Sequence, residues 1–273
     1  MSVADALREA TARLKETSDT ARLDAELLMA HALGVTRSDM LLRHMTDEAP
    51  GQFVELVNRR AMREPIAYVL GNAEFYGRSF IVTPAVLIPR SDSESVIDAA
   101  LQHTPIAGRV LDMGIGSGAL LLTLLAERPG LEGVGIDASL GAIAVAAANA
   151  GRLGLQERAH ILHANWHESG WSEDLGQFDL IIANPPYVET TAQLAPDVRD
   201  FEPASALFAG EEGLDDYRVI IPQLRGLLTD AGVAVLEIGA SQAKHVTQIA
   251  EESGFSVELR HDLEDRPRAL ILR

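Results

Sequence analysis

The chain has 273 residues, 47% of them hydrophobic, which suits one large domain or two unequal ones with a sizeable core. Its 40 Asp and Glu outnumber its 23 Lys and Arg, and the net charge of −17 argues against free DNA or RNA as the main partner, because such a surface repels phosphate backbones. The absence of cysteine excludes disulfides and thiolate metal sites and fits a reducing compartment. With no signal-peptide core and no apolar run of about 18 residues, the sequence predicts a cytoplasmic protein that does not act on membranes.

The first 73 residues show a helical pattern and form the first predicted domain. Two sets of residues recur at helical spacing: Val3, Leu7, Ala10 and Leu14, and then Leu23, Leu27, Leu28 and His31. Ser38 and Asp47 are the predicted N-caps of two further helices, since short polar side chains accept hydrogen bonds from a first helical turn. No group of polar residues converges here, so we expect a small helical domain that recognises a partner and takes no part in catalysis.

Residues 74–90 change to an alternating pattern and form the predicted link between two domains. Phe75, Phe80 and Val82 alternate with polar residues and Gly77 marks a turn, a pattern typical of a β-hairpin. The polar residues 91–94 then cap a helix predicted to run through residue 99. Arg90 is expected to pair with Glu94, four residues further on.

Residues 91–273 alternate strands and helices and form the second predicted domain. Strands are predicted at 109–112, 133–137, 159–163, 178–183, 233–238, 256–260 and 269–272, and helices near 119–127, 140–152, 214–227 and 242–253. This order predicts an α/β fold with a mostly parallel, seven-stranded sheet and helices on both faces. The last two strands have no helix between them and are expected to form an antiparallel edge.

Residues 110–119 have the pattern of a strand, a glycine-rich turn and the start of a helix. Gly114, Gly116 and Gly118 permit a tight turn and let a ligand approach the backbone, and the helix N-terminus favours an anionic group. Asp137 ends the next predicted strand, where an acid accepts hydrogen bonds from ribose hydroxyls. These residues predict an adenosine-containing cofactor. Because Gly114-x-Gly116-x-x-Ala119 also satisfies the dinucleotide fingerprint, the loop alone leaves the choice of cofactor open.

Asn184-Pro185-Pro186-Tyr187, which follows a predicted buried strand, is the most informative motif of the chain. Asn184 offers a side-chain carbonyl and an amino group, the two prolines stiffen the turn and leave its carbonyls free, and Tyr187 supplies a flat face. Such a turn is a rigid cradle for a planar group that carries an NH2. Ligands of these sheets bind at the carboxyl ends of the strands, so the cradle and the glycine loop are expected to face one crevice. Methyl transfer to a planar nitrogen can use such a cradle, whereas hydride transfer has no use for it.

These motifs resemble those of class I S-adenosylmethionine-dependent methyltransferases that act on amino nitrogen, which share Asp112-x-Gly114-x-Gly116-Ser117-Gly118 and Asn184-Pro185-Pro186-Tyr187. More specifically, the chain resembles the PrmC/HemK family, the glutamine methyltransferases of peptide chain release factors, over nearly its whole length. The block 64–71 is the most specific match, because unrelated methyltransferases lack it, and further matches lie at 74–77, 87–90 and 237–239.

The resemblance implies a Rossmann-like methyltransferase sheet, S-adenosylmethionine as cofactor and a peptide chain release factor as protein partner. The cofactor residues that it implies are Gly114, Ile115, Gly116, Ser117 and Gly118 at the methionine end, Asp137 at the ribose, Trp166 at the adenine, and Asn184. The implied substrate site is Asn184, Pro185, Pro186 and Tyr187, of which Asn184, Pro185 and Tyr187 are the catalytic residues. The helical part and the hairpin would help to dock the release factor, whose Gly-Gly-Gln loop would enter the crevice.

The chain departs from the family pattern after Arg90, where Ser91-Asp92-Ser93-Glu94 replaces Pro-Glu-Thr-Glu. The lost proline is expected to loosen the segment that walls the pocket. Asn165 stands where an Asp is common before the adenine-side residue. None of these changes removes a chemical role.

Other polar residues have simpler interpretations. Asp112 either orients the loop backbone or touches the ligand. His163 and His167 lie four residues apart, but no third ligand is apparent and we expect no metal site. An acidic group is expected to form a solvated face: Asp197, Asp200, Glu202, Glu211 and Glu212.

The leading hypothesis is methylation of the glutamine amide in the Gly-Gly-Gln motif of release factors. One alternative is glutamine methylation of a ribosomal protein, and another is N6-adenine methylation of DNA, against which the charge of −17 argues. A scaffold that has lost turnover is a non-enzymatic alternative. Transfer is expected to depend on positioning, with the proton of the nitrogen lost to a carbonyl or a water and no tuned base required.

Overall fold

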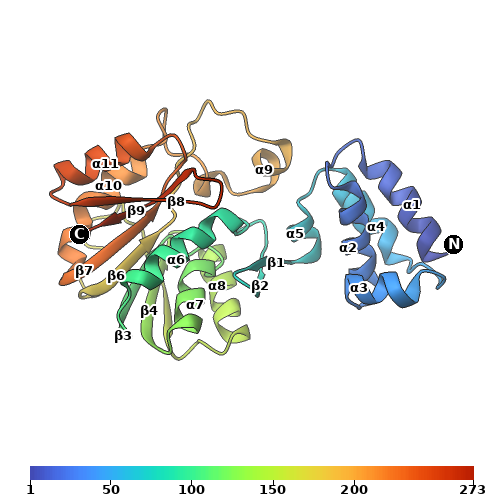
Figure 1. Cartoon of the computed structure of the whole chain (residues 1–273), viewed down its shortest axis with the longest axis horizontal. Helices are drawn as coiled ribbons and strands as arrows, with labels where there is room; N and C mark the ends of the chain where they lie inside the picture. Colours follow the sequence, from blue (N-terminus) through green and yellow to red (C-terminus); the bar gives the residue numbers. More distant parts are fainter. The chain divides into compact units, whose positions relative to one another are not determined.

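The structure, a computed structural model, describes all 273 residues and divides into two compact units (Figure 1). The helical unit comprises Met1–Asn72 and Leu194–Phe201, and the sheet unit comprises Ala73–Gln193 and Glu202–Arg273. The cores of the two units are built from separate sets of side chains. No helix is long and apolar enough to cross a membrane.

Short helical segments surround the single core of the helical unit. They are α1 (Val3–Leu14), α2 (Ala21–Leu33), α3 (Arg37–Asp39), the π-helical turn η1 (Met40–His44), α4 (Gln52–Ala61), α5 (Ile66–Leu70) and α9 (Pro196–Phe201). The predicted inward residues of α1, namely Val3, Leu7, Ala10 and Leu14, are all buried. Ser2 caps this helix by accepting a hydrogen bond from the backbone N–H of Asp5.

The inward face of α2 differs from the prediction. Leu28 is buried as predicted, but Leu23 is 41% exposed and His31 is also exposed, whereas Asp24 is buried. Oδ2 of Asp24 accepts a 2.7 Å hydrogen bond from Nε of Arg60 in α4. A buried ion pair therefore occupies an inward position where a leucine was expected. The spacing of apolar residues cannot predict this position, because it treats every acid as exposed.

The two predicted N-caps, Ser38 and Asp47, are wrong. Thr36 caps α3 instead, because its hydroxyl accepts a 3.1 Å hydrogen bond from the backbone N–H of Asp39. Asp47 lies in a turn, 2.8 Å from the imidazole of His44. The helix expected after it begins only after Gly51, without a side-chain cap.

The sheet unit alternates strands and helices as predicted, after the hairpin strands β1 (Asn72–Phe75) and β2 (Arg78–Ile81). Its sheet strands are β3 (Ala107–Met113), β4 (Gly130–Asp137), β5 (Ala159–His163), β6 (Phe178–Ala183), β7 (Leu228–Glu237), β8 (Val257–His261) and β9 (Pro267–Leu272). Its helical segments are η2 (Ser91–Ser93), α6 (Glu94–His103), α7 (Ala119–Glu127), α8 (Leu140–Arg152), η3 (Ala204–Ala206), α10 (Asp215–Leu227) and α11 (Ala243–Glu252). β7 begins before its predicted start at residue 233, because its pairing with β6 continues past a register shift.

The seven strands are ordered β5-β4-β3-β6-β7-β9-β8, which confirms the predicted fold class. β9 runs antiparallel to both of its neighbours, and the other neighbouring strands are parallel. The chain passes from β3 outward to β4 and β5 and then returns to β6 on the opposite side of β3. The connections after β3 and β6 thus lead in opposite directions, which opens a crevice at the carboxyl ends of these two strands.

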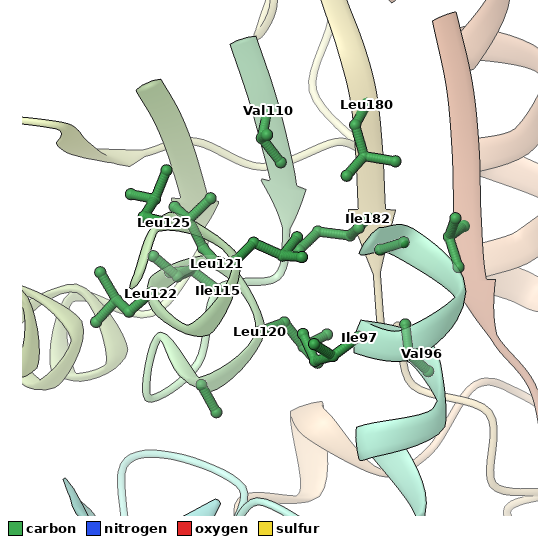
Figure 2. Close-up of a cluster of buried hydrophobic side chains, with 14 of the residues drawn as sticks. Val96, Ile97, Val110, Ile115, Leu120, Leu121, Leu122, Leu125, Leu180 and Ile182 are labelled. Atoms are coloured by element: carbon green, nitrogen blue, oxygen red, sulfur yellow. The ribbon is translucent and has the colours of Figure 1, made fainter. Parts of the chain in front are cut away.

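Helices cover both faces of the sheet. Figure 2 shows Val96 and Ile97 of α6 and Leu120 and Leu121 of α7 in one buried cluster with strand residues such as Val110. Residues of α10 and α11 pack in a second cluster, which contains Leu111, the neighbour of Val110 in β3. Successive strand residues therefore enter opposite cores, as the twofold period of a strand requires.

The hairpin is tied to the glycine-rich loop by one buried side chain, Asn149 of α8. Its Oδ1 accepts a 2.7 Å hydrogen bond from the N–H of Ile81, and its Nδ2 donates to the carbonyls of Ile81 at 3.0 Å and Ser117 at 2.8 Å. Asn149 is fully buried, so these bonds satisfy polar groups that water cannot reach. Helix α8 thereby fixes β2 and the loop before α7 together.

Candidate active site

The register of three neighbouring strands brings the predicted motifs to one edge of the sheet. Met113, the last residue of β3, pairs with Ile136 of β4 and with Ala183 of β6. The residues that follow these positions are Gly114, Asp137 and Asn184. The glycine loop, the predicted ribose acid and the cradle therefore start side by side at the carboxyl ends of their strands.

A cavity of about 510 Å³ lies at this edge, within the usual size range for small-molecule sites. Of the predicted site residues, it is lined by Gly114, Ile115, Gly116, Ser117, Asp137, Trp166, Asn184 and Pro186. Gly118, Pro185 and Tyr187 are not among its lining residues. The structure thus gathers most of the predicted cofactor residues around one space.

The glycine loop needs glycine where it turns. Gly114 has a φ of 86°, and a Cβ placed there would lie 3.3 Å from the ring of Trp166. Gly118, with a φ of 84°, is the residue before α7, and a Cβ there would lie 2.7 Å from Leu122. Both positions combine a left-handed backbone with close neighbours, which only glycine accommodates without strain.

Asp137 supports the loop from the end of β4. Its Oδ2 accepts a 3.0 Å hydrogen bond from the N–H of Gly116, and its Oδ1 accepts one of 2.9 Å from Ser139. Each carboxylate oxygen can accept a second bond, so the side chain can hold the loop and still bind a hydroxyl in the cavity.

Asp112 is fully buried beneath the same loop and also lines the cavity. Its Oδ2 accepts a 3.3 Å hydrogen bond from the N–H of Leu121, whereas its Oδ1 has no partner. Burial raises the pKa of this carboxyl to about 7, against the opposing effect of the bond from Leu121. Asp112 therefore orients the start of α7 with one oxygen and keeps the other without a protein partner.

Trp166 is held by a carboxylate that the sequence interpretation did not single out. Nε1 of Trp166 donates a 2.8 Å hydrogen bond to Oδ1 of Asp216, which lies 2.9 Å from Nε2 of His167. Asp216 is buried and lines the cavity with both rings. The other histidine, His163, lies 3.0 Å from the carbonyl of Ala138.

The cradle borders a second, smaller cavity of about 170 Å³. Its lining residues are Leu87, Arg90, Asn184, Tyr187, Val188, Ala206, Leu207 and Glu237. Asn184 lines both cavities, as do Leu87, Arg90 and Ala206, so the two cavities adjoin at these residues. Burial, followed by the nearby charge of Glu237, raises the pKa of Tyr187 to about 12, which keeps its phenol neutral.

The backbone beyond the prolines is fixed by hydrogen bonds. The N–H of Val188 donates to the carbonyl of Leu207 at 2.8 Å, and the carbonyl of Val188 accepts from Ala209 at 2.9 Å. Nε2 of the buried Gln242 donates to the carbonyl of Tyr187 at 2.9 Å. The cradle is thus anchored at its far end as well as stiffened by its prolines.

Glu237 is a site residue that the sequence interpretation missed. It is the last residue of β7, it is only 1% exposed, and its Oε2 has no partner. Burial raises its pKa to about 7, although a hydrogen bond from Ser93 and the charge of Arg268 act in the opposite direction. A signal was present, since this acid follows directly on the apolar run 233–236.

Two expectations about charged residues are wrong: the pairing of Arg90 and the exposure of Glu202. Arg90 pairs with Glu202, not with Glu94, whose Oε1 accepts a 2.9 Å hydrogen bond from the N–H of Tyr76. Glu202 is buried, because its carboxylate also accepts a hydrogen bond from the N–H of Ile88, so it does not belong to a solvated acidic face.

The segment that lacks the family proline makes contacts of its own. Residues Ser91–Ser93 form the short helix η2, and Ser93 is buried. Asp92 accepts a 2.8 Å hydrogen bond from Arg268 of β9. These contacts tie the segment to β9.

The charges around the larger cavity favour a cationic ligand over a pyrophosphate. Three carboxyl groups line it, those of Asp112, Asp137 and Asp216. The arginine that lines it, Arg90, is already paired with Glu202. A ligand with a positive sulfur and an amino group suits this surrounding, whereas a dinucleotide would bring two negative phosphates to it.

Comparison with known proteins agrees with this arrangement. Residues 5–71 match the family described as the PrmC N-terminal domain, and residues 93–201 match the methyltransferase small domain. A release factor glutamine methyltransferase from Cereibacter sphaeroides is 40% identical over all of this chain and 99% of its own length. One from Rhodospirillum rubrum is 39% identical over 92% of this chain and 78% of its own. The crystal structure of a methyltransferase from Pyrococcus furiosus shares the fold, with a TM-score of 0.55 and 15% identity over 79% of this chain and 95% of that one.

Proposed function

Because the chain belongs to the release factor glutamine methyltransferase family, we propose that it methylates the glutamine of the Gly-Gly-Gln motif in peptide chain release factors. S-adenosylmethionine is the methyl donor, and the side-chain amide nitrogen of that glutamine is the acceptor. The observation that carries the proposal is the position of Asn184, which lines both the larger cavity and the small one beside the proline turn.

The larger cavity suits the cofactor. Its glycine loop would hold the methionine end, Asp137 would bind the ribose, and Trp166, fixed by Asp216, would lie against the adenine. The carboxyl groups around the cavity match the positive charge of the ligand. When bound, S-adenosylmethionine supplies an electrophilic methyl group on a positively charged sulfur.

The cradle would prepare the amide for attack. An amide nitrogen is a poor nucleophile, because its lone pair is delocalised into the carbonyl. The side-chain oxygen of Asn184 and the carbonyl of Pro185 would each accept one N–H bond, with Pro186 and Tyr187 walling the group. Holding both hydrogens aims the lone pair at the methyl group and fixes the line of attack, which is most of what catalysis here needs.

The protein partner would be a release factor met in the cytoplasm, without direct nucleic-acid or membrane contact. Residues 1–73 would recognise the partner, 74–90 would link the two domains, and 91–273 would carry out the transfer. The helical unit supports this division, because its buried charges are engaged in ion pairs and leave no unpaired group for chemistry.

The direct test is methyl transfer from labelled S-adenosylmethionine to a purified release factor, followed by mapping of the modified residue. We expect the label on the Gly-Gly-Gln glutamine and none on a release factor in which that glutamine is alanine. Label on a ribosomal protein or on DNA in parallel reactions, with none on the release factor, would overturn the proposal in favour of one of those substrates.

The variant Asn184→Ala tests the cradle in the same assay. It should lower kcat by about 10²–10³-fold, since it removes an interaction concentrated in the transition state. Its affinity for S-adenosylmethionine should stay within a few-fold of the wild type. Gln248→Ala, which removes an exposed amide from α11, is the matched control and should keep full activity.

A further inference from the structure

We propose that Glu237 is a catalytic residue whose carboxylate accepts the proton that the glutamine nitrogen loses on methylation. The proposal rests on the proposed function, because it assigns a role within the same reaction. It replaces the expectation, drawn from the sequence, that the proton leaves to a carbonyl or a water.

Strand register places Glu237 beside the cradle. Ala183 of β6 pairs with Leu236 of β7, so the next residues along the two strands, Asn184 and Glu237, start from neighbouring backbone positions. Neighbouring strands lie about 4.8 Å apart. Both residues line the 170 Å³ cavity together with Tyr187. A substrate amide held by Asn184 would therefore lie within reach of the Glu237 carboxyl.

The carboxyl has no ion-pair partner to account for its burial. Of the nearer cations, Arg90 pairs with Glu202, whereas Arg268 bonds Asp92 through Nη2 at 2.8 Å and leaves its buried Nε without a partner. The titratable and charged groups that face Glu237 are Arg90, Asp92, Tyr187, Tyr217 and Arg268. An unpaired buried carboxyl destabilises a fold, so its presence at the cavity indicates that a ligand uses it.

The acid–base properties of Glu237 suit a proton acceptor. Burial raises its pKa to about 7, and a general base is most effective when its pKa lies near the working pH. The amide nitrogen, once it has bonded to the methyl carbon, is strongly acidic, so proton transfer to a carboxylate is favourable.

Atoms and charge are conserved in this step. The nitrogen lone pair forms the N–C bond while the S–C bond breaks, and sulfur keeps that electron pair and becomes neutral. The N–H proton held by the side-chain oxygen of Asn184 leaves that acceptor and passes to Glu237, which leaves a neutral N-methyl amide and a neutral carboxylic acid. Glu237 then returns the proton to solvent after the products leave.

Glu237→Gln tests the role, because it keeps the shape of the side chain and removes the basic oxygen. With the intact chain and a release factor, we expect kcat to fall about 10²-fold, the usual contribution of a general base. The wild-type rate should rise with pH through about 7, and the variant should lose this rise. Glu258→Gln, a half-buried glutamate of β8 that pairs with Arg260 and Arg273 and lines neither cavity, is the matched control and should behave like the wild type.

A second measurement needs neither cofactor nor substrate. Nuclear magnetic resonance of the protein labelled with carbon-13 at its glutamate carboxyls should show one group titrating near pH 7, and the variant should lack that signal. An ordinary glutamate value of about 4.3 for this group would overturn the proposal even if the variant did not fold. A folded Glu237→Gln with wild-type rate and pH profile would also overturn it.

These outcomes separate the two proposals. If the wild type methylates the release factor and the variant does so equally well, only the role of Glu237 fails. If the carboxyl titrates near pH 7 but the wild type leaves the release factor unmodified, the proposed function fails and removes the assigned role with it.

Discussion

The two units of the molecule treat buried carboxyl groups in opposite ways. In the helical unit, Asp24 is buried and paired with Arg60 at 2.7 Å. Glu26 is also buried; burial alone would raise its pKa, but hydrogen bonds from Arg22 and Arg37 lower it overall. Each of these acids is matched by a cation.

In the sheet unit, Asp112 and Glu237 are buried and each keeps one oxygen without a partner. Burial raises the pKa of both to about 7. Both line a cavity at the carboxyl ends of the strands. The comparison teaches that a paired buried acid marks a place where charge holds the fold, whereas an unpaired one beside a cavity marks a place reserved for a ligand.

Breaking a pair in the helical unit should have the largest effect. Arg60→Ala leaves the Asp24 carboxylate buried without its cation, and we expect the free energy of unfolding of this unit to fall by about 3–5 kcal/mol. Urea denaturation followed by circular dichroism measures the change. Arg8→Ala, which removes an exposed partner of Asp5, should leave the midpoint unchanged. Equal midpoints for both variants would show that the buried pair does not hold the unit.

Removing an unpaired buried acid should raise the free energy of unfolding. The pKa of Asp112 is raised in the folded protein, so its contribution to stability is complete below the unfolded pKa of 3.8 and disappears as the pH rises to about 7. Asp112→Asn removes this dependence, which amounts to at most about 1.4 kcal/mol per pH unit.

At pH 8 we therefore expect Asp112→Asn to be more stable than the wild type by about 1–3 kcal/mol. Urea denaturation at several pH values measures the difference. A variant that is less stable than the wild type at pH 8 would mean that the carboxylate is matched by an interaction within the fold, and the contrast between the units would not hold.

Asp137 is an intermediate case between the two units. It lines the larger cavity, but both of its carboxylate oxygens accept hydrogen bonds from backbone N–H groups. Asp137→Ala should weaken S-adenosylmethionine binding by about 1–3 kcal/mol through lost hydrogen bonds to the ribose. Calorimetry measures the affinity, with Glu132→Ala, an exposed acid of the same strand, as the control. Unchanged affinity would give Asp137 a purely structural role, like that of the acids in the helical unit.

The smallest effect is expected at His167. Asp216 is shared between His167 and Trp166, so His167→Ala leaves the carboxylate its bond to the tryptophan. The turnover number should stay within a few-fold of the wild type in the methyl-transfer assay. A loss as large as that of Asn184→Ala, in folded protein that still binds the cofactor, would make His167 part of the chemistry.

The sheet and its crevice were predictable because strands and helices alternate with clear apolar periods. The register then follows from the parallel pairing, which brings Gly114, Asp137 and Asn184 to one edge. The predicted roles of these residues stay predictions until a ligand is measured. Glu237 could have been noticed as an acid directly after an apolar run, but its burial depends on β9 and η2, which lie far from it in sequence.

The wrong predictions concern polar residues whose partners lie far away in the sequence. Arg90 had an acid four residues ahead, yet it bonds Glu202, which lies far away in the sequence. Asp24 took a core position on α2 because its partner is on α4. Local spacing identifies candidate pairs within a helix, whereas these pairs are decided by tertiary packing.

Asn149 has a consequence for how such sites are mapped from related sequences. It lines neither cavity, yet its amide joins β2 to the glycine loop that lines the larger cavity. No other residue type supplies one acceptor and two donors in that volume while remaining uncharged. Replacing Asn149 would leave these buried groups without partners, so invariance at this position among related chains would report on the fold and not on contact with a ligand.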